Sequence, residues 1–200
     1  MALKICTLAP FINQEFAVTG AWGEPRQGHI HAGIDLASVG SGGVAKPIYS
    51  MSQGIVKRVD QVDTGTGYGA LCIVFDQPTC DLWLYGDLGD NTVAVNVGDT
   101  VARGQLIGYE GNPSGTASTG LHVHLEKENE ADGVFKFGYN NSIDPTTGTG
   151  IDNVVYSTSG DTYIYFGETP PTPTTETKHK KFPWPVLTNK IRSRNRSLTN

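Results

Sequence analysis

The sequence has no long hydrophobic run, few cysteines and few charged residues, and each shortage excludes a class of protein. Nowhere do its 200 residues approach the roughly eighteen consecutive apolar residues that a transmembrane helix needs. The first twenty residues lack the small-residue cleavage site of a secretory signal. Three cysteines are too few, and odd in number, for a disulfide-stapled secreted scaffold. We therefore expect a protein made in a reducing cytoplasm, without a signal peptide or a membrane span.

The cysteines also lack the spacing of a structural zinc site. Cys6, Cys72 and Cys80 contain no C-x-x-C pair. Cys72 and Cys80 could pair across a hairpin, but the sequence favours free, buried thiols.

Positive charge is scarce in the body of the chain and concentrated at its C-terminal end. Seven of the fifteen Lys and Arg residues follow residue 177, and no acid does, so residues 1–177 hold 8 cations and 20 anions, a net charge of −12. An acidic body is a poor candidate for binding nucleic acid, which requires a cationic surface. The basic end could bind an anionic surface or simply be solvated.

Short β-like segments dominate the first 165 residues, and no apolar stripe with helical spacing extends over twelve residues. Glycine and β-branched patterns predict strands and hairpins at 44–59 (a hairpin around Gly54), 71–75, 82–85, 93–97, 104–109, 121–125 and 154–166 (a second hairpin). We therefore predict an all-β fold, mainly antiparallel, with little helix.

A change of composition predicts the domain boundaries. Residues 1–167 form the predicted domain, and residues 168–181 are a Pro/Thr/Lys linker that cannot bury enough apolar surface to fold alone. Residues 182–200 form a basic, aromatic C-terminal tail. This tail is either a frayed terminus or a docking peptide anchored by Phe182, Trp184 and Leu187.

The functional signal comes from two histidine clusters. In the second cluster, residues 120–126, the two-residue period of a strand places His122 and His124 on one face and apolar residues on the other. Alone, this pattern is equally consistent with solvated histidines. In the first cluster His31 and Asp35 are four residues apart. Two imidazoles and one carboxylate make the ligand set of a catalytic zinc site whose fourth position is left for water.

These motifs together resemble the lysostaphin/LytM-like zinc metallopeptidases, which are peptidoglycan hydrolases. The pattern H-x-x-x-D at His31 and Asp35 is followed about ninety residues later by H-x-H at His122 and His124. The G-Y-G at 67–69, the segment 97–108 and the Asp144-Pro145 pair match further family motifs in the same order. The resemblance covers roughly residues 18–146 and implies a LytM-like β-sandwich or split barrel.

The resemblance also implies a role for each matching residue. It makes His31, Asp35 and His124 the Zn²⁺ ligands and His122 a catalytic histidine that orients water or stabilises the oxyanion. His29 matches no family role. The family usually has a histidine where this chain has Asp87, and a carboxylate accepts hydrogen bonds but cannot donate them unless protonated.

Two functions follow as expectations. The first is a zinc endopeptidase that cuts cross-bridges or stem peptides of bacterial peptidoglycan, with Asp87 assisting His122 as a catalytic residue. The alternative is a catalytically impaired module that binds cell-wall peptide or a protein partner, because Asp87 removes a hydrogen-bond donor. A wall-cutting enzyme without a signal peptide suggests a phage setting, either release at lysis or a virion tail protein bound through the C-terminal tail.

Overall fold

The computed structural model describes residues 3–112, 120–154, 156 and 161–165. These residues form strands and loops without a helix, and therefore without a helix that could cross a membrane. The strands are β1 (Leu3–Cys6), β2 (Glu15–Gly20), β3 (Pro25–Arg26), β4 (His29–Ile30), β5 (Ile34–Ser38), β6 (Pro47–Tyr49), β7 (Gly54–Asp60), β8 (Ala70–Asp76), β9 (Asp81–Leu88), β10 (Thr100–Val101), β11 (Leu106–Tyr109), β12 (Val123–Asn129) and β13 (Thr162–Tyr165). The predicted all-β class is confirmed.

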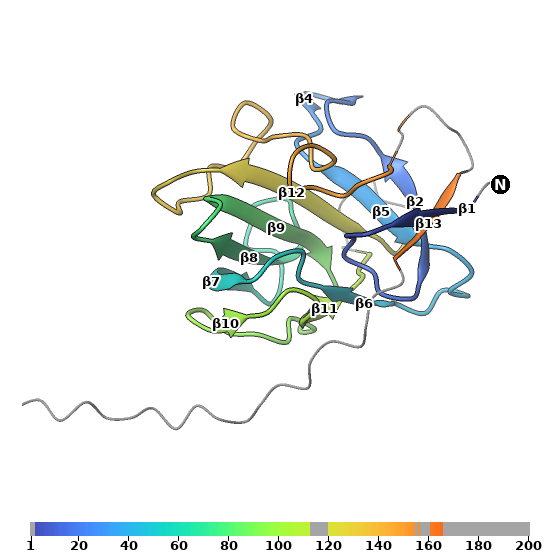
Figure 1. Cartoon of the computed structure of the whole chain (residues 1–200), viewed down its shortest axis with the longest axis horizontal. Helices are drawn as coiled ribbons and strands as arrows, with labels where there is room; N and C mark the ends of the chain where they lie inside the picture. Colours follow the sequence, from blue (N-terminus) through green and yellow to red (C-terminus); the bar gives the residue numbers. More distant parts are fainter. Residues whose placement is uncertain (1–2, 113–119, 155, 157–160, 166–200) are drawn as a thin grey trace, which may run out of the picture.

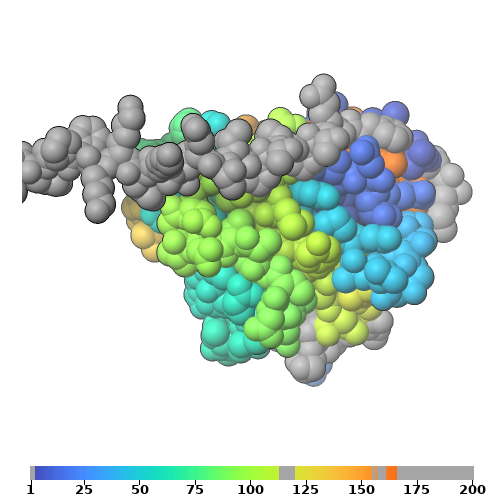
Figure 2. All heavy atoms as spheres, turned by 90° about the horizontal axis from the view of Figure 1, so that it is seen from below, coloured from blue at the N-terminus to red at the C-terminus, as the bar shows by residue number. Residues whose placement is uncertain are grey.

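Most strands belong to one large sheet in the order β1-β13-β2-β5-β12-β9-β8-β7-β10 (Figure 1). Its pairs are antiparallel except β1 with β13. A small sheet of β6 and β11 lies below it in this view, and β3 pairs with β4 in an exposed hairpin above it. Figure 2 shows the molecule from below. Residues from the middle of the chain (teal and green) form one side of this face, and N-terminal residues (blue) form the other.

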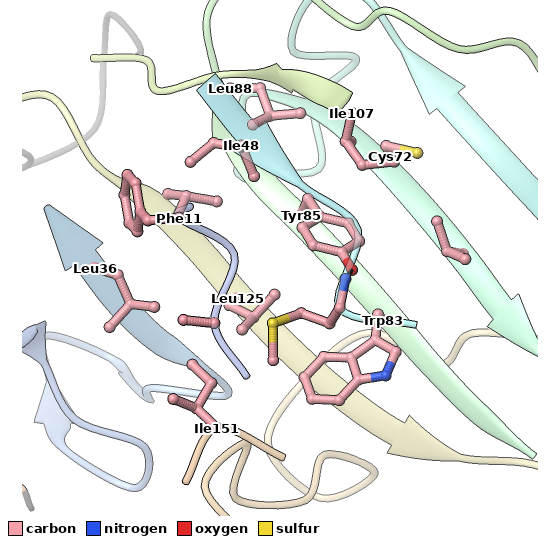
Figure 3. Close-up of a cluster of buried hydrophobic side chains, with 14 of the residues drawn as sticks. Phe11, Leu36, Ile48, Cys72, Trp83, Tyr85, Leu88, Ile107, Leu125 and Ile151 are labelled. Carbon is pink, nitrogen blue, oxygen red and sulfur yellow. Dashed lines mark hydrogen bonds between the residues drawn. The ribbon is translucent and has the colours of Figure 1, made fainter. Parts of the chain in front are cut away.

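The large sheet is buried on both faces at its centre because its strands carry apolar residues at both odd and even positions, and these point to opposite faces. Trp83 and Tyr85 of β9 join the main core, whereas Leu82 and Leu84 point to the opposite face and form a second cluster. In the main core (Figure 3) the hydroxyl of Tyr85 accepts a hydrogen bond from the Met51 amide at 2.6 Å, so this buried phenol is satisfied.

The side chains of β12 alternate between the main core and the candidate site, as predicted. Val123 and Leu125 are fully buried in the main core. His124, Glu126 and Glu128 take the other parity, and His122, directly before the strand, lines the same cleft as His124. All four polar side chains are buried, so the predicted face is correct, but it is covered by protein rather than solvated.

Three sequence predictions fail in this fold. Residues 44–59 are not a hairpin, since β6 pairs with β11 while β7 pairs with β8 and β10. Gly54, read as a turn residue, starts β7, where a Cβ would collide with the carbonyl of Phe75. Residues 93–97 alternate in burial but form no strand. β13 lies between β1 and β2, so 154–166 is not a self-paired hairpin, although part of that range lies outside the described residues.

The remaining strand predictions are close to the structure. The predicted strands at 71–75, 82–85 and 104–109 correspond to β8, β9 and β11, and the one at 121–125 begins two residues later as β12.

The three cysteines are free as expected, but Cys80 is only partly buried. Burial raises the pKa of the Cys6 and Cys72 thiols to about 12, so neither is poised for thiolate chemistry. The predicted linker and tail lie outside the described residues.

The row of buried acids on β12 makes the stability of the protein depend on pH. Glu128 is fully buried, accepts a hydrogen bond from the Lys136 amide at 2.9 Å, and burial raises its pKa from 4.5 to about 7. Because the folded state holds this proton more tightly than the unfolded state, the free energy of unfolding falls as pH rises from about 5 to 7. The shift corresponds to about 3 kcal/mol.

We therefore expect Glu128→Gln, a neutral side chain of the same shape, to flatten this dependence. Chemical denaturation of both proteins at pH 5 and pH 8 measures it. The variant should gain stability relative to the native chain at pH 8, by up to about 3 kcal/mol more than at pH 5. An equal difference at the two values would contradict the assignment of this titration to Glu128.

Candidate metal centre and active site

Neighbouring strands at the centre of the large sheet bring the first candidate residues together. In the register of β5, β12 and β9, Asp35 lies opposite His124, and His124 lies opposite Gly86. His31 follows the exposed hairpin of β3 and β4 and is tied back by a hydrogen bond from its amide to the carbonyl of Glu24 at 2.9 Å. Residues about ninety positions apart thus meet in one buried place.

Three ligand atoms form a nearly equilateral triangle there. His31 Nε2 lies 3.0 Å from His124 Nδ1 and 3.1 Å from Asp35 Oδ1, and the latter two atoms are 3.1 Å apart. The residues are between 3% and 6% exposed. The Nδ1 of His31 donates to the carbonyl of Ala21 at 2.8 Å, which in the neutral ring leaves the Nε2 lone pair directed into the triangle.

This donor set fits a metal ion. Three acceptor atoms facing one another repel unless a proton or a cation lies between them. The edges of a tetrahedral zinc site with bonds near 2.0–2.1 Å are about 3.3 Å long, close to the observed separations. His31, Asp35 and His124 are therefore the residues that could hold a zinc ion.

The charges of the triangle support the same view. Burial alone would raise the pKa of Asp35, but hydrogen bonds and charge from His124 and His31 outweigh burial and hold it well below its usual range. Burial alone would lower the pKa of His124, but the carboxylates of Asp35 and Glu126 raise it. Without a metal the triangle thus retains a proton, which metal binding would displace.

His122 and Asp87 form a second pair beside the triangle. His122 Nε2 lies 3.0 Å from Asp87 Oδ2, and His122 Nδ1 lies 3.1 Å from the carbonyl of Gly120. Burial alone would lower the pKa of His122, but its hydrogen bond to Asp87 and the charge of that carboxylate raise it. Since both partners only accept hydrogen bonds, the geometry favours an imidazolium that donates to each.

A β-bulge brings Asp87 to this face. Between Tyr85 and Leu88, β9 has one residue more than the facing part of β8, and Asp87 adopts a left-handed backbone with φ of 54°. Its amide donates to the carbonyl of Tyr68 at 2.7 Å. Bulges re-aim side chains in this way beside active sites. Strand alternation alone would have turned Asp87 toward the core.

Arg26 and Tyr68 also contact the residues of the triangle, and no sequence signal pointed to Arg26. Arg26 Nη2 donates to Asp35 Oδ2 at 2.6 Å, so the two oxygens of Asp35 have different partners. Gly20, at the end of a bulge in β2, leaves room for this ion pair, which a Cβ there would strike. Tyr68 of the G-Y-G motif packs edge-on against His124, with ring centroids 5.2 Å apart.

The candidate residues lie in an open cleft of about 1280 Å³. It is lined by aromatic and amide side chains from residues 66–68 and 137–141. Among the lining side chains are Thr66, Tyr68, Phe137, Tyr139 and Asn140. His29, for which no role was expected, is exposed at its edge.

Comparison with known proteins agrees with this geometry. The model of peptidase family M23 matches residues 29–136, more than half of the chain. The chain belongs to peptidase family M23. No curated protein sequence matched it.

Solved M23 structures share the fold. The catalytic domain of lysostaphin from Staphylococcus simulans is 22% identical, with 65% of this chain and 89% of that domain covered and a TM-score of 0.53. The catalytic domain of EnpA, a prophage-encoded M23 protein from Enterococcus faecalis crystallised as a point mutant, is 26% identical, with coverage of 70% and 96% and a TM-score of 0.52. LytU is 25% identical, with coverage of 64% and 81% and a TM-score of 0.50. The predicted LytM-like fold is confirmed.

Gly33, between His31 and Asp35, leaves the space in which the His124 ring lies. A Cβ at this position would be 2.5 Å from the carbonyl oxygen of Leu125 and 2.7 Å from His124 Nε2. We expect Gly33→Ala to lower zinc affinity about 10- to 100-fold, the usual effect of disturbing a ligand's surroundings. Competition with a chromophoric chelator measures this.

Gly108→Ala in β11 is the matched control for that variant. A Cβ at Gly108 would also be crowded, 3.3 Å from Leu88 and Thr92, but it contacts no histidine. It should cost stability and leave zinc affinity unchanged. Equal affinities of the two variants would show that crowding at Gly33 does not reach His124.

Proposed function

We propose that this M23 protein is a zinc-dependent endopeptidase that hydrolyses peptide bonds in bacterial peptidoglycan, in a cross-bridge or a stem peptide. The observation that carries the proposal is the triangle of His31, Asp35 and His124, whose atoms are spaced for one metal ion at the bottom of an open cleft. Membership of peptidase family M23 supports the reaction class, and the fold shared with lysostaphin, an antimicrobial peptidase, is consistent with it.

In the proposed mechanism these three residues would hold Zn²⁺, which would supply Lewis-acid polarisation of the scissile carbonyl and activation of water at neutral pH. His122, fixed through Nδ1 by the carbonyl of Gly120, would share its Nε2–H, which donates to Asp87 in this structure, with the oxyanion as it develops. Asp87 keeps His122 in its charged, donating form by accepting from Nε2. It thereby takes a role different from that of the family's usual histidine.

The first experiment is digestion of purified peptidoglycans of several cross-bridge types, with and without a zinc chelator, read by mass spectrometry. We expect new amine ends that appear only without chelator, and their masses identify the bond. Absence of cleavage by protein shown to contain zinc would contradict the enzyme and favour the alternative, a binding module in which Asp87 has removed a catalytic donor.

Asp87→His separates these two functions. If Asp87 serves catalysis as proposed, the native chain cleaves peptidoglycan, and Asp87→His changes the rate of an activity that is already present. If the native chain is impaired, the variant gains a donor, and a missing donor of this kind typically costs about 100- to 1000-fold in rate. Turnover detectable only in the variant would overturn the proposed role of Asp87.

The setting that we propose is a phage. The likeness to EnpA, a prophage-encoded protein, at 26% identity supports this. The enzyme would then be made in the host cytoplasm and act at the cell wall, at lysis or as a virion component held by its C-terminal tail. Mass spectrometry of purified virions tests the second possibility, and absence of the chain from them would leave release at lysis.

A further inference from the structure

A single arginine brings a permanent positive charge to the cleft. Among the Lys and Arg residues that the structure describes, Arg26 alone lines it, and residues 113–119, which belong to a neighbouring segment of the sequence, contain neither residue type. The side chain of Arg26 is 34% exposed, although it contacts a residue of the buried triangle. It therefore faces the triangle on one side and the open cleft on the other.

The protein uses only one nitrogen of the Arg26 guanidinium. Nη2 donates to Asp35 Oδ2 at 2.6 Å, and it also lies 3.3 Å from His31 Nδ1 and 3.7 Å from Glu24 Oε2. Nη1 and Nε have no hydrogen-bond partner among the described residues. Arginine carries five N–H donors in a planar fork that fits the two oxygens of a carboxylate. The other donors of Arg26 are thus available to an acceptor that enters the cleft.

The backbone holds this guanidinium beside the triangle. A Cβ at Gly20 would collide with Arg26 Nη2 and lie 2.5 Å from Asp35 Oδ2, so only glycine leaves this space open. On the other side Arg26 pairs with His29 across a tight hairpin whose turn has Gly28 in a left-handed backbone, with φ of 83°. The position of the charge is therefore built by the fold and does not depend on a freely moving surface side chain.

The charges of the cleft favour an anionic group. With Zn²⁺ in the triangle, the charge of the ion and that of Arg26 exceed those of the two carboxylates that line the cleft, Asp35 and Asp87. The body of the chain around the cleft is acidic. A cleft of one sign focuses the electric field and attracts ligand groups of the opposite sign. A substrate carboxylate would gain from this field, whereas an uncharged peptide would not.

We propose that Arg26 is a specificity-determining residue whose free donors bind a carboxylate of the substrate beside the scissile bond. The inference rests on the proposed function and narrows its substrate class. Stem peptides of peptidoglycan carry free carboxylates, at an acidic residue and at the C-terminal end, whereas a cross-bridge of glycines carries none along its length. The chain should therefore cut a stem-peptide bond next to a free carboxylate in preference to an uncharged cross-bridge.

The test uses pairs of synthetic stem peptides that contain the bond identified by peptidoglycan digestion. The two members differ only in the carboxyl group nearest that bond, which is free in one and amidated in the other. We expect the zinc-loaded full-length chain to cleave the free acid with a kcat/KM about 10- to 100-fold higher, the range for a hydrogen bond to a charged group. In Arg26→Gln this ratio should fall close to one, mainly through KM. If Arg26 acts only by holding Asp35, the substitution slows both peptides equally and the ratio stays as it was.

Arg58→Gln is the matched control. Arg58 also contacts an aspartate through Nη2 at 2.6 Å, and its side chain is 36% exposed, but it does not line the cleft. This variant should keep both zinc and the preference for the free acid. Arg26→Lys is a second variant, because lysine keeps a charge beside Asp35 without the planar fork. It should retain zinc and lose most of the preference. Zinc content by mass spectrometry accompanies every rate.

Four results would overturn the inference while leaving the peptidase in place. They are cleavage confined to an uncharged cross-bridge, equal rates for the two peptides in the native chain, a preference that survives in Arg26→Gln, and loss of zinc from both Arg26 variants, which would assign Arg26 to the metal centre alone. Absence of cleavage of any substrate by the zinc-loaded chain would overturn the proposed function, and this inference with it.

Discussion

Replacing His31 or His124 with alanine is expected to abolish zinc binding and peptidase turnover together. Each side chain supplies one corner of a triangle whose edges are 3.0–3.1 Å. Removal of one of three protein ligands leaves two, fewer than catalytic zinc sites use. Zinc content by mass spectrometry and digestion of peptidoglycan measure the two losses.

His29→Ala is the matched control for these variants. His29 is two residues from the buried His31 but is itself exposed, and its Nδ1 contacts only the carbonyl of Gln27, at 3.3 Å, among the described contacts. It should keep zinc in full. Tightly bound zinc in both His31→Ala and His124→Ala would refute the ligand assignment, whereas loss of zinc in His29→Ala would show that the hairpin itself is needed.

The sequence predicted the parts of the site that depend on a regular strand. The two-residue period predicted for residues 121–125 places His122 and His124 on one face, and in the structure both line the same cleft. Spacing could also pair His31 with Asp35, because four residues separate them on one segment. What joined the two segments was the resemblance, since periodicity within a segment does not determine which strands become neighbours.

The features that the sequence did not predict arise where strands are irregular. A bulge turns Asp87 toward His122, and another at Gly20 makes room for Arg26 to reach Asp35. A bulge adds one residue to a strand without changing its composition, so alternation assigns the wrong face beyond it. The failed hairpin at 44–59 has a related cause, because Gly54 permits close approach of a neighbouring strand rather than a turn.

His122→Ala is expected to lower kcat by about 100- to 1000-fold while one zinc ion remains bound, the range for loss of one donor to the oxyanion. His122 is outside the proposed zinc triangle, so the metal is kept, but its contact to Asp87 at 3.0 Å is the route by which that carboxylate acts. Asp87→Ala should therefore cost less than His122→Ala, because it leaves the imidazole in place.

The double variant decides whether the two residues act as a unit. If Asp87 works only through His122, then removing it from a chain that already lacks His122 has no further effect, and the double variant is as slow as His122→Ala alone. Single-turnover digestion of all four proteins, each loaded with one equivalent of zinc, gives the comparison. If the rate loss of the double variant is instead the product of the two single losses, Asp87 acts on the substrate independently. It would then be a general base rather than the partner that keeps His122 charged.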